Sequence, residues 1–304
     1  MTDYRAHFDF EISFANGGGL RGEGFRLDLP SDHGDDNVYV IGLLLIAHLG
    51  LTLVDNLEIT NLKIVEEPHK GSRGVPTSER SASGRVIDLS HTIRAGLVTY
   101  PGLPAPTVTP FLTRDDSRSR YDPGTEFAMD IITMIGNTGT YLDSPFHRYD
   151  GGTDLAGLDL ATMVNLRAEV FHLTDAWDPD NRGIHAHMLA DRDVRGAAVL
   201  LHTGWDRHFG EPAYAKGAPF LTEEGTRWLI EAGAVLVGID SLNIDDTESG
   251  GSRPAHSLLL EAGIHVVEHL THLDQLPPQG AVFSAAPPAV EGFGTFPVRA
   301  FAIV

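Results

Sequence analysis

Hydrophobic and polar residues alternate along FDFEISF (8–14) and LEITNLKIVEE (57–67). A period of two places successive side chains on opposite faces, which predicts β-strands. NGGG (16–19) marks a turn, after which LRGEGFRLDL (20–29) is expected to form another strand. The apolar run VYVIGLLLIAHLGLTLV (38–54) predicts a buried core segment, because it is shorter than the about 20 residues of a membrane span.

Apolar strand-like stretches interleave with amphipathic helical stretches after residue 85. LTEEGTRWLIEAG (221–233) predicts a helix with Thr222 as N-cap and Gly233 as its end. RPAHSLLLEAG (253–263) predicts a second, shorter helix. Interleaved strands and helices indicate an α/β fold. The predicted strands are RVIDLSH (85–91), EFAMDIITMI (126–135), RAEVFHL (167–173), AAVLLHTG (197–204), AVLVGID (234–240), HVVEHL (265–270) and RAFAIV (299–304).

The stretch 69–84 is rich in Pro, Gly, Ser and charged residues and lacks periodic apolar positions. Such a composition predicts a linker. It would separate a small β-rich N-terminal domain (1–68) from a main α/β domain (85–304). The N-terminal domain carries no chemical motif, so we expect it to serve packing or oligomerisation, with substrate gating as the alternative.

The chain is acidic, with 22 Lys and Arg against 42 Asp and Glu and a formal net charge of −20. This balance argues against nucleic acid and anionic membranes as partners, because both require clustered positive charge. The absence of cysteine excludes disulfides, thiolate metal sites and cysteine nucleophiles, so any metal must bind nitrogen and oxygen ligands. No signal-peptide pattern opens the chain, and we expect a cytoplasmic protein.

The loop GNTGTYLDSPFHRY (136–149) concentrates polar groups after an apolar strand. Asp143 and His147 lie on either side of Pro145, which prevents a regular helix between them. The glycines allow the backbone to turn sharply and to approach a ligand. An Asp and a His in such a turn suit a metal site or an acid/base pair, although turns also use Asp, Pro and Gly for their geometry alone.

Two further segments place polar groups at the ends of apolar strands. Glu268 ends the strand IHVVE, and His256 precedes it on the predicted short helix. A carboxylate there needs a partner, which a metal, a histidine or another hydrogen-bond donor can supply. In GIDSLNIDD (238–246) a strand runs into Asp240 and Ser241, at a position where α/β folds commonly bind ligands. No G-x-S-x-G pattern surrounds Ser241, so we expect this segment to line or support a pocket.

These segments, in this order, resemble the cyclase family of metal-dependent hydrolases, which includes bacterial kynurenine formamidase and isatin hydrolase. The resemblance covers about residues 86–304 and opens with VIDLSHTIRAGLVTYPGLP, where it implies that Tyr100 lies near the substrate. It implies a swivelling β/β/α domain. The family signature H-x-G-T-H-x-D-x-P-x-H corresponds here to Asn137-Thr-Gly-Thr-Tyr141-Leu-Asp143-Ser-Pro-Phe-His147.

The divalent-metal ligands implied by the resemblance are Asp143, His256 and Glu268. His147 would be the acid/base residue, whereas Asn137 and Tyr141 stand where the family has two histidines. A neutral amide oxygen is a weaker ligand than imidazole, and a phenol with a reference pKa of about 10 must lose its proton to bind well. We therefore expect at most one manganese, zinc or magnesium ion, or a metal-free site.

The resemblance implies hydrolysis of an amide, cyclic amide or lactone bond in a small molecule. One alternative is a metal-independent lyase, isomerase or cyclase that uses His147 and Tyr141 as catalytic residues; another is a non-catalytic protein that binds small molecules. The residues expected to contact the substrate are Tyr100, Asn137, Asp240 and Ser241. The resemblance also implies a homo-oligomer, a dimer or a tetramer.

Overall fold

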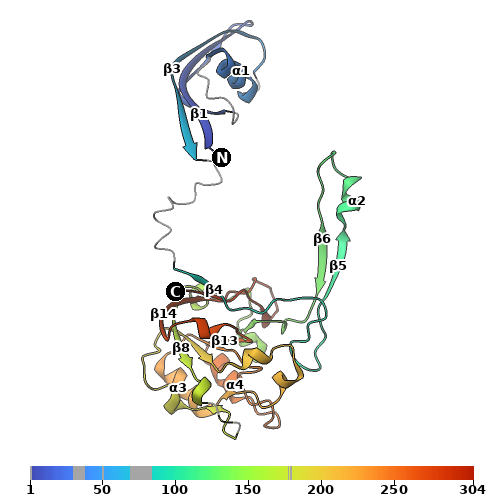
Figure 1. Cartoon of the computed structure of the whole chain (residues 1–304), viewed down its shortest axis with the longest axis vertical. Helices are drawn as coiled ribbons and strands as arrows, with labels where there is room; N and C mark the ends of the chain where they lie inside the picture. Colours follow the sequence, from blue (N-terminus) through green and yellow to red (C-terminus); the bar gives the residue numbers. More distant parts are fainter. Residues whose placement is uncertain (1, 30–37, 50, 69–83, 177, 179) are drawn as a thin grey trace. The chain divides into compact units, whose positions relative to one another are not determined.

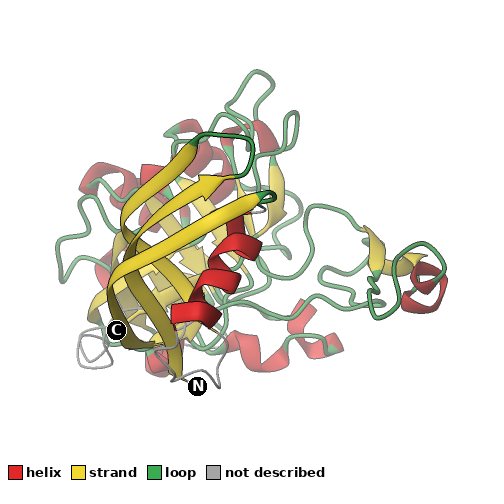
Figure 2. Ribbon diagram, turned by 90° about the horizontal axis from the view of Figure 1, so that it is seen from above, coloured by secondary structure: helices red, strands yellow, loops and turns green. Residues whose placement is uncertain are grey.

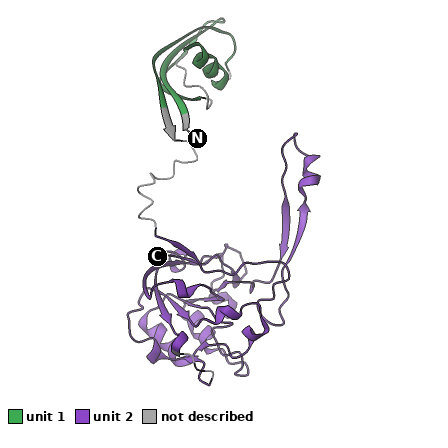
Figure 3. Cartoon of the chain, in the orientation of Figure 1, with its two compact units in different colours: residues 1–83 green, residues 84–304 purple. Residues whose placement is uncertain are grey.

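The computed structural model describes residues 2–29, 38–49, 51–68, 84–176, 178 and 180–304. The chain divides into two compact units, residues 1–83 (unit 1) and 84–304 (unit 2), each with its own hydrophobic core (Figure 3). The predicted linker lies outside the described residues except for Gly84.

Unit 1 is a three-stranded antiparallel sheet with one helix. Its elements are β1 (Thr2–Phe14), β2 (Gly19–Leu29), α1 (Val38–Leu49) and β3 (Val54–Pro68), and the strand order is β2-β1-β3. Alternate β1 residues from Ala6 to Ile12 are buried in one cluster with Ile41 and Leu45 of α1, which runs along one face of the sheet (Figure 2). The three predicted strands are confirmed, and most of the apolar run 38–54 is the helix that covers them.

Unit 2 is built on a nine-stranded mixed sheet of order β15-β7-β13-β12-β10-β8-β14-β16-β4. Its four central strands β13, β12, β10 and β8 are parallel, and the flanking strands pair antiparallel. The elements are β4 (Val86–Asp88), β5 (Thr107–Leu112), α2 (Arg114–Arg118), β6 (Met129–Thr133), β7 (Tyr141–Asp143), β8 (Leu166–His172), β9 (Gly183–Ile184), β10 (Ala198–His202), β11 (Phe220–Leu221), α3 (Glu223–Ala232), β12 (Leu236–Ile239), α4 (Pro254–Glu261), β13 (His265–Glu268), β14 (Gln279–Ser284), β15 (Thr295–Pro297) and β16 (Phe301–Ile303).

Both faces of the central sheet are buried. Along β10, Val199 and Leu201 join a cluster with Leu229 of α3 and Leu259 of α4, whereas the intervening residue Leu200 joins the cluster on the other face. This double burial explains why the central strands are continuous apolar runs. Helix α3 begins after its predicted N-cap Thr222 and ends at Gly233, which adopts a left-handed conformation.

Strands β5 and β6 form a separate two-stranded ribbon that, with α2, projects from the body of unit 2 (Figure 1). The strand predicted at 126–135 is confirmed in part, because β6 covers its middle. All five residues of β6 are exposed. In the described part of the chain, no helix combines the length and the apolar character that crossing a membrane requires.

Candidate active site

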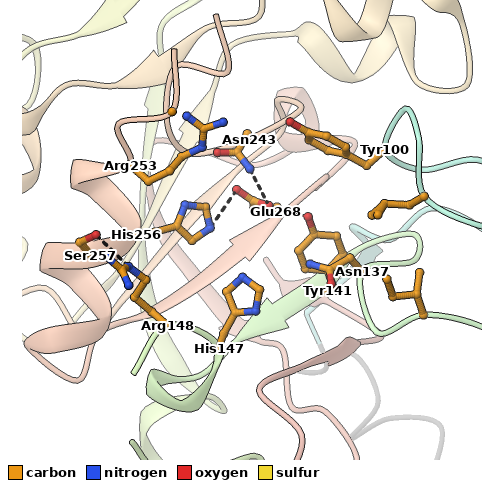
Figure 4. Close-up of a pocket in the computed structure, with 13 residues that line it drawn as sticks. Tyr100, Asn137, Tyr141, His147, Arg148, Asn243, Arg253, His256, Ser257 and Glu268 are labelled. Carbon is orange, nitrogen blue, oxygen red and sulfur yellow. Dashed lines mark hydrogen bonds and ion pairs between the residues drawn. The ribbon is translucent and has the colours of Figure 1, made fainter. Parts of the chain in front are cut away.

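A pocket of about 550 Å³ lies where β7, β13 and α4 meet (Figure 4). This volume falls in the range of small-molecule sites. Its lining includes Tyr141, His147, His256 and Glu268, and the buried carboxylate of Asp143 lies directly behind it. The structure thus brings together all five residues for which we predicted a catalytic or metal-binding role.

The register of β7 places two of these groups opposite two others. Tyr141 pairs across the sheet with Glu268 of β13, and Asp143 pairs with Thr295 of β15. Side chains directly opposite each other in an antiparallel pair are close enough to interact. The Tyr141 hydroxyl donates to Glu268 Oε2 at 2.6 Å, and the Thr295 hydroxyl donates to Asp143 Oδ1. Strand pairing therefore fixes both carboxylates.

His147 ends a short 3₁₀ helix, Pro145–His147, that follows β7. Its Nδ1 lies 2.8 Å from Thr295 Oγ1. Because the Thr295 hydroxyl already donates to Asp143, Nδ1 must carry the proton of this bond, which leaves Nε2 as the acceptor. A Cβ at Gly294 would collide with the His147 backbone, so the close approach of β15 requires glycine.

His256 is oriented by a buried carboxylate, Asp245. Oδ2 of Asp245 accepts from His256 Nδ1 at 2.7 Å and from the His256 backbone nitrogen at 3.0 Å, and Oδ1 accepts from the Ala255 nitrogen at 2.7 Å. With Nδ1 committed to Asp245, Nε2 faces Asp143 Oδ2 and Glu268 Oε1, each at 3.5 Å. A histidine held in this way by a second carboxylate is a common arrangement for metal-binding imidazoles.

Tyr141 belongs to a buried hydrogen-bond chain. Since its hydroxyl donates to Glu268, its oxygen accepts from His269 Nε2 at 3.2 Å, and His269 Nδ1 accepts from Tyr214 at 2.8 Å. Burial lowers the pKa of His269 to about 3 and, with the charge of Glu268, raises the pKa of Tyr141 well above its ordinary value. The phenol thus keeps its proton. Glu268 Oε1 also accepts from the Ile244 nitrogen at 2.6 Å.

The floor of the pocket favours a positive charge, because two carboxylates are buried there and, among the described residues, only histidines form ion pairs with them. Burial raises the pKa of Glu268 to about 7, against the opposing effect of His256. Burial alone would also raise the pKa of Asp143, but His256 and His147 hold it below its usual value. Burial disfavours the charged form of His256, yet Glu268 and Asp143 raise its pKa well above normal.

The donor atoms fit a divalent metal ion. Asp143 Oδ2 is buried and has no hydrogen-bond partner among the residues that the structure describes, and donor atoms of Asp143, His147 and His256 all lie within 4.8 Å of one another. Ligands about 2.1 Å from a tetrahedral ion are about 3.4 Å apart, close to the 3.5 Å that separates His256 Nε2 from Asp143 Oδ2 and Glu268 Oε1. The residues present can therefore hold such an ion.

Comparison with known proteins identifies the family of this chain. The family model described as "Putative cyclase" matches residues 87–246. The chain is 31% identical over 219 residues to kynurenine formamidase of Geobacillus thermodenitrificans, covering 70% of this chain and 95% of the relative. The chain belongs to the cyclase family. Among solved structures, isatin hydrolase A from Ralstonia solanacearum matches this cyclase-family chain with a TM-score of 0.61 and 25% identity, covering 72% of this chain and 92% of that one. A "potential metal-dependent hydrolase with cyclase activity" matches with a TM-score of 0.58 and 26% identity, covering 72% and 96%.

The residues expected to contact substrate in this cyclase-family protein divide into two groups. Tyr100 and Asn137 line the pocket, and their contact with a substrate stays a prediction (Figure 4). Asp240 and Ser241 do not line it, and both are fully buried. Asp240 instead accepts hydrogen bonds from Thr203 and the Gly204 nitrogen, and Ser241 donates to the Pro219 carbonyl. Both side chains thus fix loops behind the site, which corrects the prediction that they face the substrate.

Sequence reasoning missed several residues that shape the site. In the sequence, Asp245 is one of several acidic residues that follow β12. Its hydrogen bonds to His256 depend on where α4 begins, which the sequence pattern did not fix. Thr295 carried no signal, because its contact with Asp143 arises from strand pairing across more than 150 residues. Arg148 and Arg253 also line the pocket. Their flanking residues gave no pattern that distinguished them from surface arginines.

Proposed function

We propose that this protein is a hydrolase that cleaves an amide, cyclic amide or lactone bond of a small molecule with the help of one divalent metal ion. The observation that carries the proposal is the convergence of Asp143 Oδ2, His256 Nε2 and the exposed imidazole of His147 at one end of the pocket. The relatives named as hydrolases of an amide and of isatin support the reaction class.

Asp143 and His256 would hold the ion, with Glu268 as third ligand. Such an ion supplies a Lewis acid for a carbonyl and lowers the pKa of a bound water. His147 accepts the water proton at Nε2, because its Nδ1–H is held by Thr295, and then returns a proton to the leaving group. The His147 side chain is 36% exposed, so it can reach both the water and the substrate.

The metal-free alternative makes the phenol of Tyr141 a catalytic residue that donates to an oxyanion of the substrate. Its proton is directed at Glu268, its oxygen accepts from His269, and its side chain is only 2% exposed. A donor already used in this way is poorly placed to stabilise an oxyanion on a substrate. We therefore propose that Tyr141 positions Glu268, and that the protein binds one metal ion rather than two.

Metal content and activity of matched variants test the proposal. Wild-type protein, purified without chelator or a metal-binding tag, should contain about one divalent ion per chain by mass spectrometry, and His256→Asn should lose it. His147→Asn should keep the ion but lose about 10²- to 10⁴-fold in hydrolysis of amides and lactones, as expected for a general acid/base residue. Metal loss in His147→Asn would identify it as a ligand. Full activity in that variant would refute the acid/base assignment.

We also propose that the chain forms a homo-oligomer through the β5–β6 ribbon. The ribbon exposes large apolar side chains, among them Phe111 (67% exposed), Ile131 and Ile132. A two-stranded ribbon is marginally stable by itself, and a second copy of the chain would cover these residues. Light scattering should give a dimer or larger assembly for the wild type and a smaller one for Phe111→Ser/Ile131→Ser. The same mass for both proteins would contradict this interface.

A further inference from the structure

Two arginines, Arg148 and Arg253, line the pocket in a chain whose formal net charge is −20. Within the residues that the structure describes, neither guanidinium has a carboxylate oxygen within 4.0 Å. The nearby carboxylates of Asp246 and Glu248 both bind Arg182 instead, at 3.1 Å each. In so acidic a protein, two cations that line a small-molecule pocket without an acidic partner among the described residues indicate a site for an anion.

Both arginines are held in place through neutral groups. Arg148 Nε donates to Ser257 Oγ at 3.2 Å, and its guanidinium lies over the Tyr149 ring. Arg253 donates from one terminal nitrogen to the carbonyl oxygens of Asp246 at 3.1 Å and Ser252 at 2.8 Å. Each guanidinium carries five N–H donors, so donors remain on both for a ligand. Bonds to neutral acceptors fix the side chains without cancelling their charge.

The floor and rim of the pocket therefore differ in charge. Asp143 and Glu268 lie at the floor, where they disfavour an anion unless a metal ion is bound. Arg148 and Arg253 lie on the α4 side, whereas Tyr100 and Asn137 lie across from them (Figure 4). A ligand that fits both regions has its reactive carbonyl near His147 and a negative group at some distance from it.

We infer that the substrate carries a carboxylate separate from the bond that is cleaved, and that Arg148 and Arg253 bind this carboxylate. The planar, two-pronged guanidinium matches a carboxylate better than any other side chain does. The apolar wall formed by Leu103 and Ile135 would contact the body of the substrate. The inference rests on the proposed function for the position of the reacting bond, but the anion site itself does not.

Binding of two small probes of similar shape tests the inference without turnover. Benzoate and benzamide are titrated by calorimetry into the full-length chain after passage over chelating resin, so that no metal ion holds the carboxylate. Benzoate should bind about tenfold more tightly than benzamide, as expected for a charge-assisted bidentate contact. Arg148→Gln and Arg253→Gln should each lower benzoate affinity about tenfold and leave benzamide unchanged. Arg114→Gln, an exposed arginine on α2 outside the pocket, is the matched control and should behave as wild type.

Wild-type benzoate affinity in both pocket variants would overturn the inference, provided that their thermal unfolding matches that of the wild type. Inorganic phosphate is titrated in parallel, and tighter binding of phosphate than of benzoate would overturn the choice of a carboxylate. Arginine-dependent benzoate binding in a protein that hydrolyses no amide or lactone would refute only the proposed function. Hydrolysis of neutral substrates with no arginine-dependent binding would refute only the anion site.

Discussion

Replacing Asp245 with asparagine tests how the site orients His256. In the wild type both Asp245 oxygens accept, one from the Ala255 nitrogen and the other from His256 Nδ1. Asparagine has one acceptor oxygen, so if that oxygen stays on Ala255, an amide N–H faces Nδ1. Nδ1 must then lose its proton, and Nε2, the atom that faces Asp143 and Glu268, must carry it. A protonated Nε2 has no lone pair for a metal ion.

Loss of such an outer carboxylate weakens metal binding about 10- to 100-fold, which corresponds to about 1.4–2.7 kcal/mol. Calorimetric titration of metal-free protein with manganese and with zinc measures this loss directly. Glu261→Gln is the control, because it removes one negative charge from the exposed end of the same helix. Urea unfolding followed by tryptophan fluorescence reports unit 2 alone, since all three tryptophans belong to it. A folded Asp245→Asn protein with wild-type metal affinity would refute the orientation argument.

Three further changes test other contacts. Tyr141→Phe removes a buried donor to Glu268 and should lower the free energy of unfolding of unit 2 by about 1–3 kcal/mol in urea; unchanged stability would show that the phenol does not hold the carboxylate. Thr295→Val removes the acceptor of His147 Nδ1–H and should lower kcat about tenfold or more, whereas wild-type kcat would show that the imidazole needs no such support. Burial lowers the pKa of His265 to about 4 from an ordinary 6.5. The unfolded chain therefore binds this proton more readily, so stability is present above pH 6.5 and falls by about 1.4 kcal/mol per unit as the pH drops towards 4. His265→Gln should flatten this part of the urea-unfolding profile, and an unchanged profile would exclude His265 as its source.

The amino-acid pattern was sufficient for most elements of the fold. Alternation along β1 and the caps of α3 are local signals, because a strand period or an N-cap depends on a few neighbouring residues. The ribbon strand β5 and the edge strand β15 gave no comparable signal. A three-residue strand such as Thr295–Pro297 is defined only by the partner with which it pairs.

The residues of the candidate active site also fall into two groups, those that the sequence predicted and those that only the structure identified. The motif between Asn137 and His147, together with His256 and Glu268, identified the acids and imidazoles that meet in the pocket, because metal and proton chemistry require those side chains. Their partners could not be read from the chain. Asp240 and Ser241 have the right chemistry at the end of a strand, but their side chains are used inside the fold.

The sequence by itself determined which acidic and imidazole side chains are available to the site, and the family to which the chain belongs. Only the tertiary structure decided what each group does. Tyr141 faces Glu268 because β7 pairs with β13 in that register, and Thr295 joins Asp143 to His147 because β15 pairs on the other side. These contacts depend on strand register, which is set by the packing of the whole sheet rather than by local residues.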